Sequence, residues 1–139
     1  MTNQMSLITL GVSDISRSKQ FYEAGFGWRP GLETPEIAFY QMNGFVLGLW
    51  SPEALSEDSG GATGTGPGAV ALAHNVGAEA DVDVVMDRLV AAGATRTQPA
   101  SAPPHGGRRG YVTDPDGHVW EIAWNPDWPI SPEGYVTLT

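Results

Sequence analysis

Few side chains in this sequence are placed to do chemistry, and Glu121 is the most informative of them. It lies in the apolar segment 119–124, flanked on its own strand face by Val119 and Ala123. Buried there, its carboxyl group would have a raised pKa and could transfer protons, so Glu121 is the candidate catalytic residue. As an anion it would instead anchor a cationic ligand, and without a function it would hydrogen-bond to a neighbour such as Thr9. The sequence leaves these three interpretations open.

The other candidates for metal binding or nucleophilic catalysis are three histidines, and there is no cysteine. The missing cysteine excludes thiolate metal sites, disulfides and a cysteine nucleophile. His74 ends a predicted strand, His105 lies in a Pro- and Gly-rich loop, and His118 follows a turn. No strand register that we can draw brings the three together, and no nucleophilic triad is visible. We therefore expect no histidine-based metal site.

Charge and length restrict the class of protein. The 139 residues match one domain. The chain has 16 acidic and 7 basic residues and a net charge of −9, which disfavours nucleic acid and favours a cationic small molecule. No apolar run approaches the roughly 20 residues of a membrane span, and the first residues lack a basic leader before an apolar core. We expect a cytoplasmic protein with no membrane partner.

Two similar series of predicted elements must position these residues. The first begins with a strand at 7–12 and continues with a helix at about 15–23 that Asp14 caps. The second begins with a strand at 69–74 and continues with a helix at 81–92, whose apolar residues recur at helical spacing. The remaining strands are expected at 28–32, 37–42 and 45–50 in the first series, and at 95–98, 109–113 and 119–124 in the second.

Each series has the order strand, helix, strand, strand, strand, so we predict an α+β protein built from two βαβββ modules. Alternation along the first strands puts Leu7 and Thr9 on one sheet face of module one. It puts Ala69 and Ala71 on the corresponding face of module two, with Val70 in the core. We expect one domain over 1–139, comprising module one (5–55), a Gly-rich linker (56–67), module two (68–126) and an extended tail (127–139).

Two motifs carry a family resemblance. Residues 10–14 read LGVSD, 18–22 read SKQFY, and 111–122 read YVTDPDGHVWEI, in which a glutamate follows the glycine of the turn by four residues. Along 5–126 the chain resembles the glyoxalase/bleomycin resistance/extradiol dioxygenase superfamily. The resemblance implies the vicinal oxygen chelate fold. In that fold the two modules form a cupped mixed sheet, and His or Glu side chains hold a divalent metal that acts as a Lewis acid.

The metal-ligand positions of that superfamily carry over to this chain one by one. The first-strand and last-strand ligands of module one fall on Leu7 and Gly48, and those of module two fall on Ala69 and Glu121. Three of these residues have no donor atom, and one carboxylate cannot hold a catalytic metal that needs about three protein ligands. The resemblance therefore implies a fold without the superfamily's metal, and we expect no cofactor.

The same positions imply a pocket for a small molecule with apolar walls and a few polar groups. Along 45–51 the chain is also similar to the fosfomycin-resistance thiol transferases, in which residues at positions similar to Thr9 and Tyr111 touch the drug. Trp50 shares the strand face of Gly48 and could stack on a ligand. The predicted ligand-binding residues are Leu7, Thr9, Gly48, Trp50, Ala69, Ala71, Tyr111 and Glu121.

Three functions remain open from the sequence. The first is a metal-free small-molecule-binding protein that resembles the bleomycin-resistance branch, an acidic homodimer that holds a cationic ligand. The second is a glyoxalase-type lyase, isomerase or dioxygenase that uses a nonstandard metal site or Glu121 as its acid and base. The third is a structural member without a ligand. We favour the first, whether the modules pair within one chain or between two. Arg108 and Arg109 either close over an acidic ligand or form an exposed pair.

Overall fold

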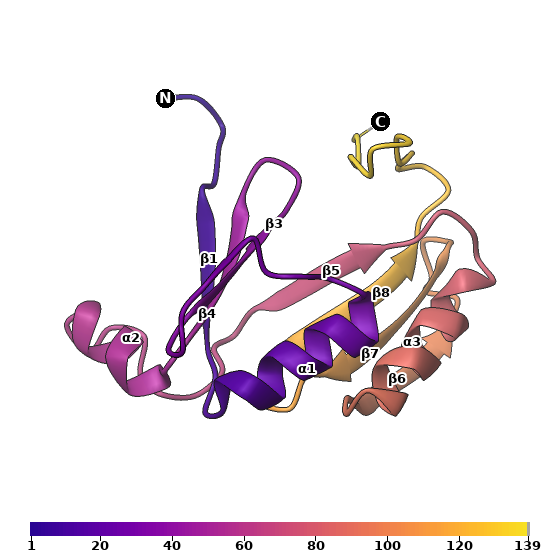
Figure 1. The fold of residues 1–139 in the computed structure, drawn as a ribbon. Coiled ribbons are helices and arrows are strands. Elements are labelled where there is room, and N and C mark those ends of the chain that lie inside the picture. Colours follow the sequence, from indigo (N-terminus) through magenta and orange to yellow (C-terminus); the bar gives the residue numbers. More distant parts are fainter. Residues whose placement is uncertain (139) are drawn as a thin grey trace.

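The computed structural model describes residues 1–138 and contains two four-stranded mixed sheets and three helices (Figure 1). The first module comprises β1 (Leu7–Gly11), α1 (Ile15–Phe26), β2 (Leu32–Glu33), β3 (Ala38–Gln41) and β4 (Val46–Trp50), and α2 (Pro52–Asp58) follows it. The second module comprises β5 (Ala71–Asn75), α3 (Asp81–Ala91), β6 (Thr95–Ser101), β7 (Arg108–Thr113) and β8 (Val119–Trp124). The predicted α+β class and the βαβββ order of both modules are confirmed.

The two sheets have the same topology. The strand orders are β1-β4-β3-β2 and β5-β8-β7-β6, in which β1 pairs parallel to β4 and β5 pairs parallel to β8. The other pairs are antiparallel. The first strand of each module therefore lies at an edge of its sheet. Within residues 1–138, one side of β1 and one side of β5 pair with no other strand.

Helix α2 lies where the sequence analysis placed the end of module one and the start of the linker. The signals for it are local: the Ser51 side chain accepts a hydrogen bond from the Ala54 N–H, Pro52 occupies the first turn, and Glu53 adds a negative charge there. At the other end of the linker, β5 begins at Ala71, so Ala69 precedes the strand. The Gly-rich connector therefore covers residues 59–70 rather than 56–67.

Glycines and prolines set other element limits. The first helix is longer than the predicted 15–23: α1 continues through Gly25 to Phe26, and Gly27 caps it at φ +79°. A Cβ at Gly25 would lie 2.7 Å from Leu89 Cδ2, so this glycine permits α1 to approach α3 closely. Strand β6 runs past Pro99 to Ser101 with two irregularities in its pairing, as an edge strand permits.

The inner faces of both sheets pack against α1 and α3 in one hydrophobic core (Figure 1). Leu10 and Leu47 come from the first sheet, and Trp120 and Ile122 from the second. The predicted alternation in β1 is confirmed, because Leu10 is buried whereas Leu7 is exposed. Val70, which we expected in the core, is 57% exposed because it precedes β5.

Polar contacts also join the two modules. The Tyr22 hydroxyl donates to Asp114 Oδ2 at 2.7 Å and accepts a hydrogen bond from Trp120 Nε1 at 3.1 Å. The Ser13 N–H donates to Asp116 Oδ1 at 2.8 Å, and His118 Nε2 lies 2.7 Å from the Gly11 carbonyl oxygen. The turn at 114–117 thus connects module two to the end of β1 and to α1, and it holds the modules in one arrangement.

Candidate functional site

Tyr111 and Glu121 form the one pair of predicted site residues whose polar groups meet within residues 1–138. They lie opposite each other on β7 and β8, and the Tyr111 hydroxyl donates to Glu121 Oε2 at 2.5 Å. Both side chains are half-buried on the outer face of the second sheet. The hydrogen bond to Glu121, together with burial, raises the pKa of Tyr111. The hydrogen-bond partner of Glu121 is therefore Tyr111 rather than Thr9.

Two alanines lie beside this pair, on the strands next to it and along it. Ala73 is the neighbour of Glu121 on β5, and Ala123 follows Glu121 on the same face of β8. A ligand that approaches this face meets a short, charge-assisted hydrogen bond beside alanines. Glu121 offers a carboxylate and Tyr111 offers a hydroxyl, with the exposed Ala73 and the buried Ala123 beside them. This arrangement can bind a polar group of a small molecule or exchange a proton with it.

The outer face of the first sheet carries Leu7, Thr9, Gly48 and Trp50. Gly48 does not open a cavity there. A Cβ at Gly48 would lie 3.2 Å from Phe39 Cε1 and 3.4 Å from Leu7 Cδ1, so these two side chains already fill the space above the glycine. A neighbouring pocket of about 450 Å³ lies along Leu7, Phe39 and the exposed Leu32. This face is mainly apolar, in contrast to the Tyr111–Glu121 face.

The predicted residues thus divide into two sets within one chain. Because the inner faces of both sheets pack against the same core, their outer faces point away from it within residues 1–138. The set on the first sheet is Leu7, Thr9, Gly48 and Trp50, and the set on the second is Ala71, Tyr111 and Glu121, with the exposed Ala69 just before β5. Ala71 and Thr9 lie on edge strands, which brings them near a further pocket.

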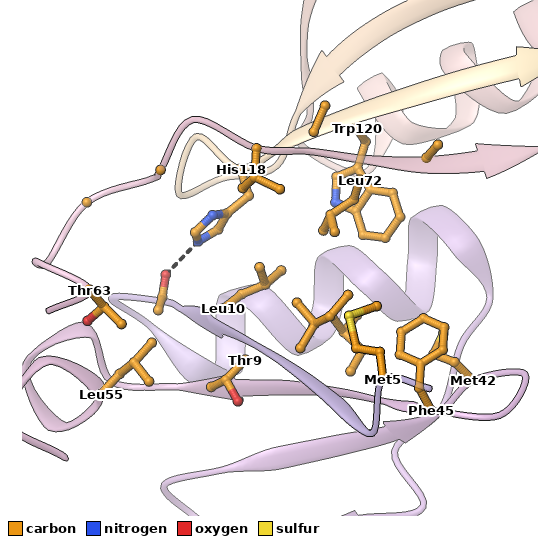
Figure 2. A pocket seen from close by; sticks show the side chains of 18 residues that line it. Met5, Thr9, Leu10, Met42, Phe45, Leu55, Thr63, Leu72, His118 and Trp120 are labelled. Carbon is orange, nitrogen blue, oxygen red and sulfur yellow. Dashed lines mark hydrogen bonds between the residues drawn. The ribbon is translucent and has the colours of Figure 1, made fainter. Parts of the chain in front are cut away.

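That pocket, of about 640 Å³, lies between the modules and is shown in Figure 2. Its walls are mostly apolar: Leu10 and Leu72 come from the two edge strands, and Trp120 lies behind Leu72. His118 points toward Gly11, whose carbonyl oxygen it meets (Figure 2). Thr9 and Ala71 line this pocket, but Glu121 and Tyr111 do not. Within residues 1–138 this pocket is therefore distinct from the Tyr111–Glu121 pair.

The residues at the superfamily's metal positions do not fit a metal ion. Leu7, Gly48 and Ala69 carry no donor atom, and the Glu121 carboxylate already accepts a hydrogen bond from Tyr111. Within residues 1–138, no group of three His, Asp or Glu side chains lies close enough to hold a metal.

Comparison with known proteins identifies the family. The sequence model of the Glyoxalase/Bleomycin resistance protein/Dioxygenase superfamily matches residues 4–122. The chain belongs to this superfamily. With its two four-stranded mixed sheets it has the vicinal oxygen chelate fold, as the motifs at 10–22 and 111–122 indicate.

Solved structures of the superfamily agree with this assignment. The crystal structure of a glyoxalase-related enzyme from Fulvimarina pelagi is 57% identical, with a TM-score of 0.96, over 99% of both chains. Two others share the fold: a glyoxalase/bleomycin resistance protein/dioxygenase family enzyme from Burkholderia phytofirmans PsJN (21% identity, TM-score 0.76, 87% of this chain and 98% of that one) and lactoylglutathione lyase from Agrobacterium tumefaciens (22% identity, TM-score 0.72, 94% and 100%).

Within residues 1–138, none of the helices combines the length and apolar composition that a membrane-spanning helix needs.

Sequence reasoning missed Phe39, which fills the space above Gly48. The register β3–β4 places Phe39 directly beside Gly48, and the Asn43-Gly44 turn in the sequence gives that register in advance. The sequence therefore already indicates that the large side chain of Phe39 lies beside Gly48 and fills the space above it.

Proposed function

We propose that this protein binds a small organic molecule on the outer face of its second sheet, without a metal, at the Tyr111–Glu121 pair. The observation that carries the proposal is the 2.5 Å hydrogen bond between the two side chains, half-buried beside alanines. A carboxylate and a hydroxyl held together on one sheet face are the few placed polar groups that a ligand site needs. In this proposal Glu121 orients the Tyr111 hydroxyl and accepts a hydrogen bond from the ligand.

The proposal includes a homodimer, because the site lacks apolar walls within one chain. Those walls are available on the outer face of the first sheet, where Leu7 is 46% exposed and Leu32 is 63% exposed. A second copy that places its first sheet opposite Tyr111 and Glu121 would enclose a ligand between an apolar and a polar face. The outer face of module one in one chain would then lie opposite the outer face of module two in the other.

The open edges of the sheets support this arrangement. Strands β1 and β5 each have one unpaired side, and such edges readily accept another chain. The pocket between the modules lies along these edges, and Met5 and Val70 on its rim are 56% and 57% exposed. Apolar rims and unpaired strands of this kind mark a surface for protein association. A second copy would cover both.

A second candidate function is an enzyme of the lyase or isomerase type. Two observations favour it: the Fulvimarina pelagi protein, which is 57% identical, is described as an enzyme, and the Tyr111–Glu121 pair can share a proton. In such a reaction the Tyr111 hydroxyl would turn from Glu121 and donate its hydrogen bond to the carbonyl oxygen of the substrate, while Glu121 accepts a proton from the neighbouring carbon and returns it. Glu121 is then the catalytic residue, and no metal takes part.

A thermal-shift screen of small organic acids, amines and carbonyl compounds tests the proposed function. We expect compounds that raise the Tm of the wild type but act weakly on Glu121→Gln and Tyr111→Phe. Glu57→Gln on α2 is the matched control, since Glu57 is exposed and distant in the fold, and it should respond as the wild type does. Compounds that stabilise all variants equally would contradict the site. Turnover of a stabilising compound, lost in Glu121→Gln, would favour the enzyme.

A further inference from the structure

Arg109 differs from the other basic residues of the chain in having no carboxylate partner while being half-buried. Five of the seven basic side chains form ion pairs: Arg17–Asp116, Lys19–Glu33, Arg29–Glu23, Arg96–Asp87 and Arg108–Asp83. Of the other two, Arg88 is exposed and donates to the Ala24 carbonyl. Arg109 Nη1 donates to the neutral Ser101 Oγ at 2.9 Å. Its charge has no counterion within residues 1–138.

The neighbouring Arg108, by contrast, forms an ion pair within the chain. Arg108 points to the inner side of β7, where its guanidinium lies 2.9 Å from Asp83 on α3. Arg109 points to the outer face, as Tyr111 does, because side chains alternate along a strand. The two arginines that are adjacent in the sequence are therefore not a pair in the structure, and only Arg109 faces the proposed site.

The chemistry of Arg109 fits an oxyanion. A partly desolvated guanidinium without a counterion is unfavourable, and a carboxylate can satisfy it with two parallel hydrogen bonds. The Ser101 hydroxyl holds one side of the guanidinium and leaves other N–H groups free to donate. The chain has 16 acidic residues, and the structure places none of them against Arg109 within residues 1–138.

Spacing along the sheet sets the size of the ligand. Arg109 and Tyr111 are successive residues on one face, about 7 Å apart along the strand. Glu121 lies opposite Tyr111, and Ala123 lies opposite Arg109, so the space between the guanidinium and the carboxylate is bordered by a small side chain. A ligand that reaches both groups needs an acidic end and a hydrogen-bond donor a few bonds away.

We propose that Arg109 binds the carboxylate of a small organic acid whose hydroxyl or amino group reaches Glu121. This inference rests on the proposed function, since it names the ligand class of the same site. The net charge of the chain favours a cationic ligand. An organic acid that also carries an amino group meets both expectations. An amine without an acid group would leave Arg109 unpaired, and we expect it to bind more weakly.

Two matched probes test the inference: phenyllactate, which has a carboxylate and a hydroxyl, and its uncharged amide, phenyllactamide. Both are titrated at millimolar concentrations into ¹⁵N-labelled protein, and the dissociation constants are taken from backbone amide shifts of β7 and β8. We expect phenyllactate to bind at least about tenfold more tightly than the amide. In Arg109→Gln the affinity for phenyllactate should fall by about the same factor, while that for the amide is unchanged.

Three controls keep the result interpretable. Arg96→Gln removes a cation on the same sheet that Asp87 already pairs, and it should leave both affinities unchanged. Ser101→Ala removes the internal hydrogen bond of Arg109 but keeps its charge, so phenyllactate binding should be retained. The Tm and the chemical-shift dispersion of Arg109→Gln establish that this variant is folded. Arg109→Lys keeps the positive charge but loses the two parallel N–H donors of the guanidinium, so it should bind phenyllactate with intermediate affinity.

The outcomes separate this inference from the proposed function. Equal binding of phenyllactate to the wild type and Arg109→Gln, with shifts on β7 and β8, would overturn the role of Arg109 and leave the site. If both probes instead shift the pocket between the modules, or if neither shifts β7 or β8, then the proposed site is wrong and this inference fails with it. Tighter binding of the amide than of the acid would also overturn it.

Discussion

Replacing Tyr22 with Phe should destabilise the fold strongly, because its hydroxyl joins the two modules from a fully buried position. Tyr22 has 0% exposure, its hydroxyl donates to Asp114 Oδ2 at 2.7 Å, and it accepts from Trp120 Nε1 at 3.1 Å. The lost bond to a charged group costs about 2 kcal/mol, and the unpaired indole N–H adds about 1 kcal/mol. We expect a loss of about 3 kcal/mol in the free energy of unfolding, or about 10 °C in Tm.

Urea unfolding followed by tryptophan fluorescence measures this change, and Tyr135→Phe is the matched control because Tyr135 is 53% exposed in the tail. The Phe variant also tests the origin of the pH dependence. Burial and the Asp114 carboxylate raise the pKa of Tyr22, so unfolded Tyr22 ionises first as pH rises above about 10 and wild-type stability falls there. Tyr22→Phe should lose stability less steeply in that range. A variant within about 0.5 kcal/mol of the wild type would refute the reasoning.

Three further predictions concern the site and its surroundings. Glu121→Gln removes the negative charge that helps to raise the pKa of Tyr111, so this pKa should move down toward 10. The titration of tyrosinate absorbance measures it, and comparison with Tyr111→Phe assigns the signal to Tyr111. An unchanged pKa would contradict the pairing of Tyr111 with Glu121. Burial against Phe26 and Trp28 lowers the pKa of His74, so stability should fall as pH drops below about 6.5, and urea midpoints of His74→Phe should lack that component. Protein purified without chelator should carry no stoichiometric Zn, Ni, Mn or Fe; about one equivalent per chain, lost in Glu121→Ala, would restore a metal site.

Much of the fold could be predicted because its signals are local. Alternation in 7–12 gave the inner and outer faces of β1, and the Asn43-Gly44 and 114–117 turns gave the hairpins that end each module. The class and the order of elements follow from these patterns. The same reasoning failed at Val70 and Ala69, because nothing local shows whether an apolar residue after a Gly-rich linker already belongs to the strand.

The sequence predicts which residues belong to the site but not how they are arranged, because the arrangement depends on packing between distant parts of the chain. The pattern placed Tyr111 and Glu121 on one sheet face, and the register of β7 and β8 makes them direct partners. Alternation also separates Arg108 from Arg109, although the sequence analysis treated them together. The orientation of the two modules, by contrast, depends on Tyr22, Asp114 and Trp120 meeting in the core, contacts between residues 92 to 98 positions apart.

In the proposed dimer, the outer face of the first sheet in one copy faces the Tyr111–Glu121 face of the other. The most direct measurement is an isotope-filtered NOE experiment on a mixture of labelled and unlabelled chains, which detects only contacts between copies. We predict NOEs between the Leu7 methyl groups of one copy and the Tyr111 ring of its partner. Within one chain these side chains lie on sheet faces that point away from a shared core. A monomer, or a dimer whose NOEs join other surfaces, would contradict the account.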